Sequence, residues 1–198
     1  MRTVAIVGRA KETRDFAPFD KPHIDIWAFN DYAMGLPRVS GVFETHADCL
    51  TTDRYEEEYR DWLRQPHPFP IWMHAADPQI PASLAFPRHS ISALYSGLWH
   101  GAEKVQDFYT STTPYALALA IYKHYTRVEL YGIELYDNGY RKQGDSIFFW
   151  LGQAAARGIE VAIHEKSNLY RDALYPLKGD YHAKETKTPE RTGYARIR

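Results

Sequence analysis

The chain has 198 residues, enough for one complete hydrophobic core, whereas two domains would each be small. Its 44% hydrophobic and 25% charged residues are ordinary globular values, and a formal net charge of −1 offers no broad positive surface for duplex nucleic acid. The single cysteine, Cys49, excludes an intramolecular disulfide and a cysteine-rich zinc site. The only apolar run near the start is too short for a signal peptide or a spanning helix, so we expect a cytoplasmic protein without a membrane partner.

The first part of the chain alternates strand-like runs with one helical segment. Tyrosine, tryptophan and leucine recur among charges in residues 53–63, which predicts an amphipathic helix. Short apolar or β-branched runs predict four strands, at residues 3–7, 24–29, 41–44 and 69–73. Residues 75–102 contain several proline and serine residues without a steady period, and we expect a long functional loop or lid there.

The pattern is sharper in the second part. Pro114 suits a first helical turn, and Gly158 suits a helix C-cap. The predicted elements are a helix over residues 115–124, a strand over 127–131, a helix over 146–157 and a strand over 159–163. This alternation predicts an α/β fold, a Rossmann-like three-layer sandwich with a mostly parallel sheet. We expect a single nucleotide-binding domain over residues 1–176 and a polar tail over 177–198 that is either disordered or a clasp for a partner.

Ligands of open parallel sheets bind beyond the carboxyl ends of the strands, so the residues that follow each strand are the first candidates. Gly8 ends the first strand and leads into a basic loop that contains Arg9, Lys11 and Arg14. The backbone amides and cations of this loop could meet a pyrophosphate. The alternative is a solvated basic turn, because the loop has one glycine where dinucleotide sites have three.

The next two strands also end in polar side chains. Asn30 can pair with the edges of a base or a ribose, although asparagine is equally common in turns. Glu44, His46 and Asp48 share one face if the backbone stays extended after the third strand. This trio predicts a base with an orienting carboxylate, a set of metal ligands, or solvated groups without a chemical role.

Hydroxyl groups follow in the second part. Residues 110–113 are all serine or threonine and precede the alanine-rich helix, where they could cap the helix, hold a phosphate, or do both. Tyr136 and Tyr140 flank a tight Asp-Asn-Gly turn after the fifth strand, and their phenols could hold phosphate oxygens. His164 leaves the last strand, where we expect it to face solvent.

Four short motifs occur in one order: VAIVG at residues 4–8, IWAFN at 26–30, YTST at 109–112 and LYGIELY at 130–136, with Asn138-Gly139 and Tyr140 after the last. In this order and spacing the chain resembles the bacterial sialyltransferases that use CMP-sialic acid, over about residues 3–169. It also resembles the related domain of archaeal 6-hydroxymethylpterin diphosphokinases, and small uncharacterised phage proteins of similar length.

The resemblance implies roles for the residues that match these motifs. Tyr136 and Tyr140 would bind the phosphate and assist the departure of CMP. Contacts to the nucleotide or sugar would fall to Gly8, Asn30, Thr110, Ser111 and Thr112. The chain departs from the family in its first loop, which lacks the second glycine, and in the segment that carries the family's catalytic histidine.

Because that histidine has no counterpart, we infer another base, either His46 or His164. We expect a nucleotide-dependent transferase, most consistent with a glycosyltransferase that uses a nucleotide-sugar donor. In this mechanism His46, oriented by Glu44, deprotonates the acceptor while Tyr136 and Tyr140 stabilise the leaving phosphate. The expected partner is a small nucleotide ligand, no metal or cofactor is required if the tyrosines neutralise the charge, and a homo-oligomer is left open.

Two alternatives remain at this point. One is a pyrophosphate-transferring enzyme, which would need a divalent metal such as magnesium at Glu44, Asp48 or Glu134. The other is a non-catalytic nucleotide-binding or sequestering protein of phage origin, which would bind tightly without turnover.

Overall fold

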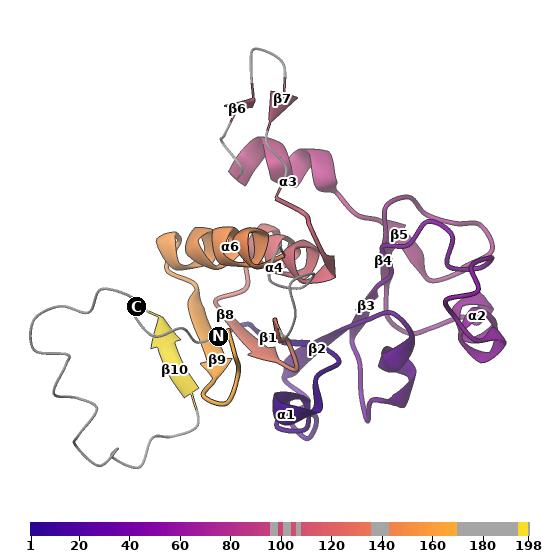
Figure 1. Cartoon of the computed structure of the whole chain (residues 1–198), viewed down its shortest axis with the longest axis horizontal. Helices are drawn as coiled ribbons and strands as arrows, with labels where there is room; N and C mark the ends of the chain where they lie inside the picture. Colours follow the sequence, from indigo (N-terminus) through magenta and orange to yellow (C-terminus); the bar gives the residue numbers. More distant parts are fainter. Residues whose placement is uncertain (96–98, 101–103, 106–107, 136–142, 170–193, 198) are drawn as a thin grey trace, which may run out of the picture.

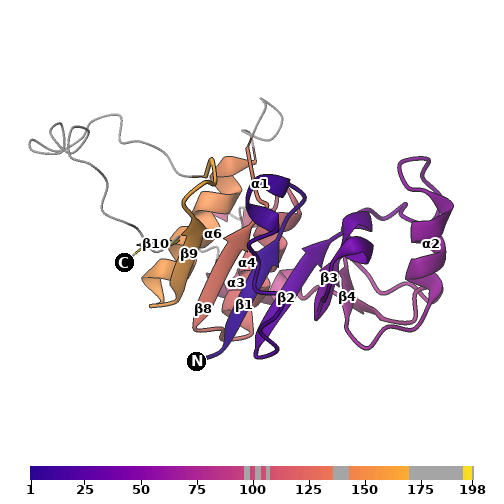
Figure 2. The same ribbon diagram turned by 90° about the horizontal axis from the view of Figure 1, so that it is seen from below.

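A computed structural model describes residues 1–95, 99–100, 104–105, 108–135, 143–169 and 194–197. Its centre is a sheet with the strand order β10-β9-β8-β1-β2-β3-β4-β5, in which only β10 runs antiparallel to its neighbour. Figure 2 shows the strands from β9 to β4 side by side. The bounds are β1 Thr3–Val7, β2 Ile24–Phe29, β3 Gly41–Phe43, β4 Ile71–Met73, β5 Ser83–Ala85, β8 Arg127–Tyr131, β9 Glu160–His164 and β10 Tyr194–Ile197.

The central strands form because their side chains are buried on both faces of the sheet. All five residues of β1 are buried, and β2, β8 and β9 are buried except for one residue each. Strands of this kind read as continuous apolar runs rather than as an alternation, which is why the sequence predicts them closely. The predicted α/β, mostly parallel, Rossmann-like architecture is confirmed.

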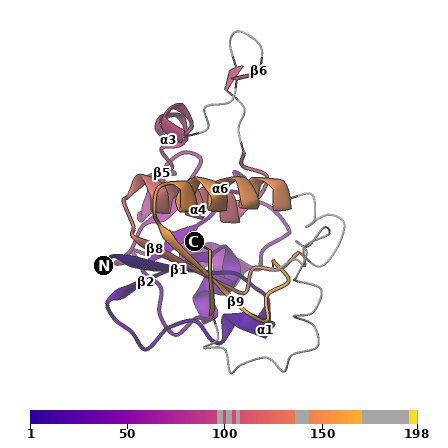
Figure 3. The ribbon, with the colours of Figure 1, turned by 90° about the vertical axis from the view of Figure 1, so that its left-hand side faces the viewer.

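Helices cover both faces of the sheet, as Figures 1 and 3 show. The helices α4 (Thr112–Tyr122) and α6 (Gly144–Ala156) pack on one face over a core that includes Trp27, Phe43 and Trp72. The opposite face is covered by α1 (Lys11–Arg14), the 3-10 helix η1 (Asp31–Gly35) and α2 (Glu57–Arg64). Residues 113–121 of α4 are all buried, so this helix is apolar around its whole circumference.

The predicted long loop over residues 75–102 is wrong in part. The strand β5 adds to the sheet edge beside β4, and α3 (Arg88–Tyr95) follows it. After α3 come the two short strands β6 (Trp99–His100) and β7 (Lys104–Val105), which pair with each other. The strand β5 was missed because it has only three residues and lies at an edge, where two of its side chains are exposed and no apolar run is needed.

Part of the predicted polar tail belongs to the sheet, since residues 194–197 form β10 and pair with β9. The predicted C-cap Gly158 has a positive φ of +73°, as a residue that ends a helix in the left-handed region does. Among the residues that the structure describes, no helix is long and apolar enough to cross a membrane.

Candidate functional site

A first cleft opens at the carboxyl edge of the sheet, between the ends of β1, β2 and β8 and the amino end of α4. Its volume is about 330 Å³, within the range of small-molecule sites. The strand β1 lies between β2 and β8, so the chain order reverses here, and open parallel sheets bind ligands at such a switch point. The first cleft is lined by residues 8–10, 29–32, 111–113 and 132–135, with Gln143 and Ile147.

Gly8 and Gly132 bring the backbones after β1 and β8 into close contact at this cleft. The amide of Gly8 donates to the carbonyl of Tyr131 at 2.7 Å, and the amide of Gly132 donates to Oγ1 of Thr13 at 2.7 Å. A Cβ atom on Gly8 would lie 2.2 Å from the carbonyl oxygen of Gly132. The glycine at position 8 is therefore required by packing between two loops, and its contact with a nucleotide stays a prediction.

Three buried polar atoms of the first cleft have no hydrogen-bond partner among the described residues. They are Oδ1 of Asn30, Oγ of Ser111 and Oε1 of Glu134. The other carboxyl oxygen of Glu134 accepts a hydrogen bond from the amide of Asn168 at 2.7 Å, and burial raises the pKa of this carboxyl group. An unsatisfied buried polar group costs about 1–3 kcal/mol, so a ligand that bonds to these atoms would recover part of that cost.

Asn30 has an unusual backbone as well as an unpartnered side chain. Its φ of 49° and ψ of −148° lie in a region that glycine adopts far more readily than other residues. Its backbone amide donates to the carbonyl of Phe43 at 3.0 Å, which fixes the end of β2 against β3. An asparagine chosen only because it suits a turn would not need a strained backbone or leave the oxygen of its side-chain amide without a partner. Asn30 is therefore a candidate for ligand contact.

The amino end of α4 adjoins the same cleft. Ser111 is at the N-cap position, but its side chain makes no capping hydrogen bond to the helix. Oγ1 of Thr112 lies 3.2 Å from Oγ1 of Thr45, and Thr110 donates to the carbonyl of Gln143 at 3.4 Å. Because Ser111 leaves its capping role unfilled, the first-turn amides and the helix dipole remain suited to an anion.

Of the three cations predicted to face a phosphate, only Arg9 lines the first cleft. Its guanidinium forms an ion pair with Asp31 at 3.0 Å, and both side chains are exposed. Lys11 is exposed on α1, and Arg14 pairs with Asp15 at 3.1 Å. The loop after β1 turns into the short helix α1 directly after Ala10, and Nη1 of Arg14 donates to the carbonyl of Arg9 at 3.4 Å.

This arrangement predicts different effects for two neighbouring charges. Arg9→Ala should weaken nucleotide binding about 10- to 100-fold, as expected for a lost hydrogen bond to a charged group, while Lys11→Ala should leave it unchanged. Nucleoside binding should be unaffected in both variants, because nucleosides lack the phosphate. Calorimetric titration with matched nucleotide and nucleoside would measure this. Equal losses in the two variants would indicate a diffuse basic surface instead of a specific contact.

A second cleft of about 360 Å³ adjoins the first and shares Asn30, Ser111, Thr112 and Gln143 with it. Two histidines, His46 and His74, line this second cleft. The remaining residues of its lining are Thr45, Tyr109, Thr110 and Tyr115.

The predicted contact between His46 and Glu44 is present. Nδ1 of His46 lies 2.7 Å from Oε1 of Glu44, and the amide of His46 donates to the same oxygen at 2.8 Å. Glu44 is fully buried, whereas the side chain of His46 is 28% exposed. A carboxylate only accepts hydrogen bonds, which assigns the proton to Nδ1 and leaves the lone pair on Nε2 in the neutral ring.

Two tyrosines complete this network. The hydroxyl of Tyr59 donates to Oε2 of Glu44 at 2.8 Å, and the hydroxyl of Tyr55 lies 2.8 Å from Nδ1 of His46. Burial raises the pKa of both phenols, and the charge of Glu44 raises it further, so both remain protonated. Asp48, expected to share a face with Glu44 and His46, is instead exposed, because the chain leaves the extended conformation after His46 and turns.

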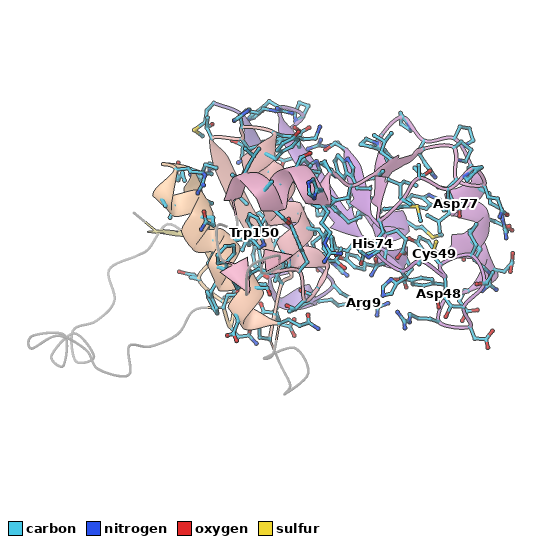
Figure 4. The ribbon with its side chains drawn as sticks, turned by 90° about the horizontal axis from the view of Figure 1, so that it is seen from above. Arg9, Asp48, Cys49, His74, Asp77 and Trp150 are labelled. Atoms are coloured by element: carbon cyan, nitrogen blue, oxygen red, sulfur yellow. The ribbon has the colours of Figure 1, made fainter. Side chains whose placement is uncertain are left out.

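The carboxylates proposed as metal ligands occupy three different surroundings. Glu44 is buried within the histidine–tyrosine network, Asp48 is exposed, and Glu134 lines the first cleft. Figure 4 labels Asp48, which lies near Cys49 on the side of the molecule that carries α2. In the described part of the chain, no group of three histidine, cysteine, aspartate or glutamate residues could hold a metal ion.

Two further predictions concern the last strands. Tyr136 and Tyr140 lie outside the described residues, so their roles stay predictions. The expectation that His164 faces solvent is wrong, since it is 6% exposed and its ring stacks on Phe16 at 4.5 Å between centroids. Burial lowers the pKa of His164, and the residue lines neither cleft.

Sequence reasoning missed Thr13, Tyr55, Tyr59 and His74. His74 directly follows β4, so the rule that picks out strand ends could have found it. Tyr55 and Tyr59 are four residues apart, a spacing that places them on one side of the predicted helix, but nothing local indicates that this side meets Glu44. Thr13 bonds to a residue 119 positions away and has no local signal.

Fold and clefts together define a Rossmann-like α/β protein with two adjoining clefts at the switch point of its sheet. No family model and no curated protein sequence matches the chain. Among solved structures, it is similar to the sialyltransferase CstII from Campylobacter jejuni in complex with the substrate analogue CMP-3FNeuAc. The identity is 15%, the TM-score is 0.52, and the match covers 93% of this chain and 98% of that one.

A second structure of this sialyltransferase, in complex with a trisaccharide acceptor and CMP, matches with 16% identity and a TM-score of 0.50, over 92% of this chain and 98% of that one. Thiamine pyrophosphokinase from Bacillus subtilis matches with 10% identity and a TM-score of 0.44, over 83% of this chain and 61% of that one. At these identities the similarity to CstII shows a shared fold.

Proposed function

We propose that this protein is a nucleotide-dependent transferase that uses a nucleotide-sugar donor. The observation that carries the proposal is the set of unpartnered buried atoms of Asn30, Ser111 and Glu134 around one cleft at the switch point. Such atoms are costly unless a polar ligand meets them. The CMP-sugar analogue bound by the structurally similar CstII supports a nucleotide as that ligand.

In this proposal the nucleotide lies in the first cleft. The amides of the first turn of α4 and the guanidinium of Arg9 bind its phosphate, and Asn30 contacts the base or ribose. Tyr136 and Tyr140, which follow Leu135 along the chain, assist the departure of the phosphate. The reacting sugar carbon is then directed toward the second cleft, which shares Asn30 and the end of α4 with the first.

The chemical step follows from the geometry of His46. Nε2 accepts the proton of an acceptor hydroxyl in the second cleft, and the hydroxyl oxygen forms a bond to the sugar carbon. The bond from that carbon to the phosphate oxygen breaks, and its electron pair stays on the nucleotide phosphate. The proton remains on the imidazole, and the adjacent carboxylate of Glu44 stabilises the resulting imidazolium.

The test is a thermal-shift panel of nucleosides, nucleotides and nucleotide sugars on the full chain. A true ligand at 100 times its dissociation constant adds about 2.7 kcal/mol of stability, which is about 5–10 °C for a protein of this size. Release of nucleotide from the best nucleotide sugar would then show turnover. Absence of a shift with every compound would refute the proposal, and binding without turnover would favour the sequestering alternative.

Asn30→Gly sharpens this test, because it removes the amide side chain while suiting the backbone conformation. We expect the unliganded variant to be as stable as the wild type or up to about 2 kcal/mol more stable, since the strain at this residue is relieved. Nucleotide affinity should fall about 3- to 10-fold through the lost hydrogen bonds. Unchanged affinity would remove Asn30 from the site, whatever the stability.

A further inference from the structure

The carboxylate of Glu44 is held from two sides by elements that are distant in the sequence. One oxygen bonds to the backbone and ring of His46, and the other accepts the hydroxyl of Tyr59 from α2. Glu44 is fully buried, and no lysine or arginine forms an ion pair with it among the described residues. Its orientation therefore depends on these hydrogen bonds, and Tyr59 is the partner of Oε2 that the described residues provide.

The position of α2 is fixed by hydrogen bonds of Arg60 and by ring contacts of Tyr55 and Tyr59. Nη1 of Arg60 donates to the carbonyls of Thr52 at 3.0 Å and Tyr55 at 2.7 Å, which ties the preceding turn to the helix. The rings of Tyr55 and Tyr59 pack at 4.8 Å between centroids, and the ring of Tyr55 meets that of His46 edge-on at 5.7 Å. Tyr59 on α2 and Tyr55, two residues before the start of α2, thus bring two phenols to one histidine–carboxylate pair.

We propose that Tyr59 is a positioning residue that acts through Glu44 to hold His46 with its proton on Nδ1 and its lone pair on Nε2. Without the Tyr59 hydroxyl, Oε2 would lose the hydrogen bond that fixes it, and the buried carboxylate would rotate toward another donor. That rotation weakens the acceptor that fixes the Nδ1 proton, so both ring tautomers of His46 become populated. As a contribution to catalysis, this role rests on the proposed function of His46.

The chain offers a matched control for removing one buried phenol. Tyr125 is also buried, and its hydroxyl donates to Oδ2 of Asp25 at 2.5 Å. Asp25 lies in β2 one residue after its start, at the opposite end of the sheet from the clefts. Tyr59→Phe and Tyr125→Phe each retain the ring and remove one hydroxyl from a carboxylate, so they separate a general loss of stability from an effect on His46.

The experiment measures the ring nitrogens of His46 by ¹⁵N NMR in the full chain, together with kcat and KM for the nucleotide sugar that the panel selects. Tyr59→Phe should convert a single Nδ1–H tautomer into a mixture and lower kcat on the order of 10-fold, with KM unchanged, because a hydrogen bond to a charged group is lost. Tyr125→Phe should lower the melting temperature and change neither the tautomer nor kcat.

A Tyr59→Phe protein that retains the single tautomer would overturn the proposal, and so would an equal loss of kcat in Tyr125→Phe. The tautomer is measured without substrate. A wild-type chain that never turns over would therefore refute the proposed transferase function, while the NMR comparison still decides the positioning role of Tyr59.

Discussion

Replacing His46 with alanine should lower turnover of the nucleotide sugar by about 10²–10⁴-fold, the usual contribution of a general base. Nucleotide affinity should change by less than about 2-fold, because His46 lines the second cleft and not the first, where the nucleotide phosphate is proposed to bind. Turnover falls because alanine removes the one group of the Glu44 network that, among the described residues, lines a cleft. Single-turnover kinetics for the chemical step and calorimetry for nucleotide binding would measure the two quantities separately.

His23→Ala is a suitable control, because His23 is exposed and precedes β2 at the opposite end of the sheet. A double variant of His46→Ala with Glu44→Gln provides a second check. If the two residues act as one unit, the double variant should be no slower than His46→Ala alone, since the carboxylate contributes only through the imidazole. Full activity of His46→Ala would exclude it as the base, and additive losses would show that Glu44 acts on the substrate by another route.

The central strands could be predicted from the sequence because burial on both faces leaves a continuous apolar signal. The strand β5 lies at an edge and lacks that signal, so the sequence predicts a long loop or lid over residues 75–102 in its place. Among the site residues, the pairing of Glu44 with His46 could be predicted from the sequence, because alternate side chains of an extended segment share one face. Asp48 falls outside this rule because the chain turns before it, and a turn of this kind depends on packing beyond the local sequence.

The tertiary contacts of the site could not be predicted from local patterns. Tyr59 meets Glu44 only because α2 packs against the face of the sheet that carries Ala28 and Val42. Asn30 could be named as a strand-end residue, but its positive φ and unpartnered oxygen are properties of the folded chain. Sequence reasoning thus located the edge of the sheet where the site lies, and the structure determined which side chains at that edge face one another.

At position 8, the sequence and the structure give different reasons why the residue is a glycine. A glycine after the first strand suggests close approach of a phosphate to the backbone. In the structure, the space beside its Cα is filled by Gly132, whose carbonyl oxygen would lie 2.2 Å from an added Cβ and whose carbonyl carbon would lie 2.7 Å from it. Both are backbone atoms, which cannot move aside as the end of a flexible side chain can.

Gly8→Ala should therefore destabilise the protein by about 1–3 kcal/mol even without a ligand, since the loops after β1 and β8 must separate to admit one methyl group. Gly152→Ala is the matched control, because that position lies in α6 with no atom within 4 Å of an added Cβ. It should raise the stability by about 0.5–1 kcal/mol through helix propensity. Urea unfolding of both variants in the absence of nucleotide measures the difference. If Gly8→Ala kept wild-type stability and lost only nucleotide affinity, the glycine would be required by the ligand, and the contact between the two loops would not be its cause.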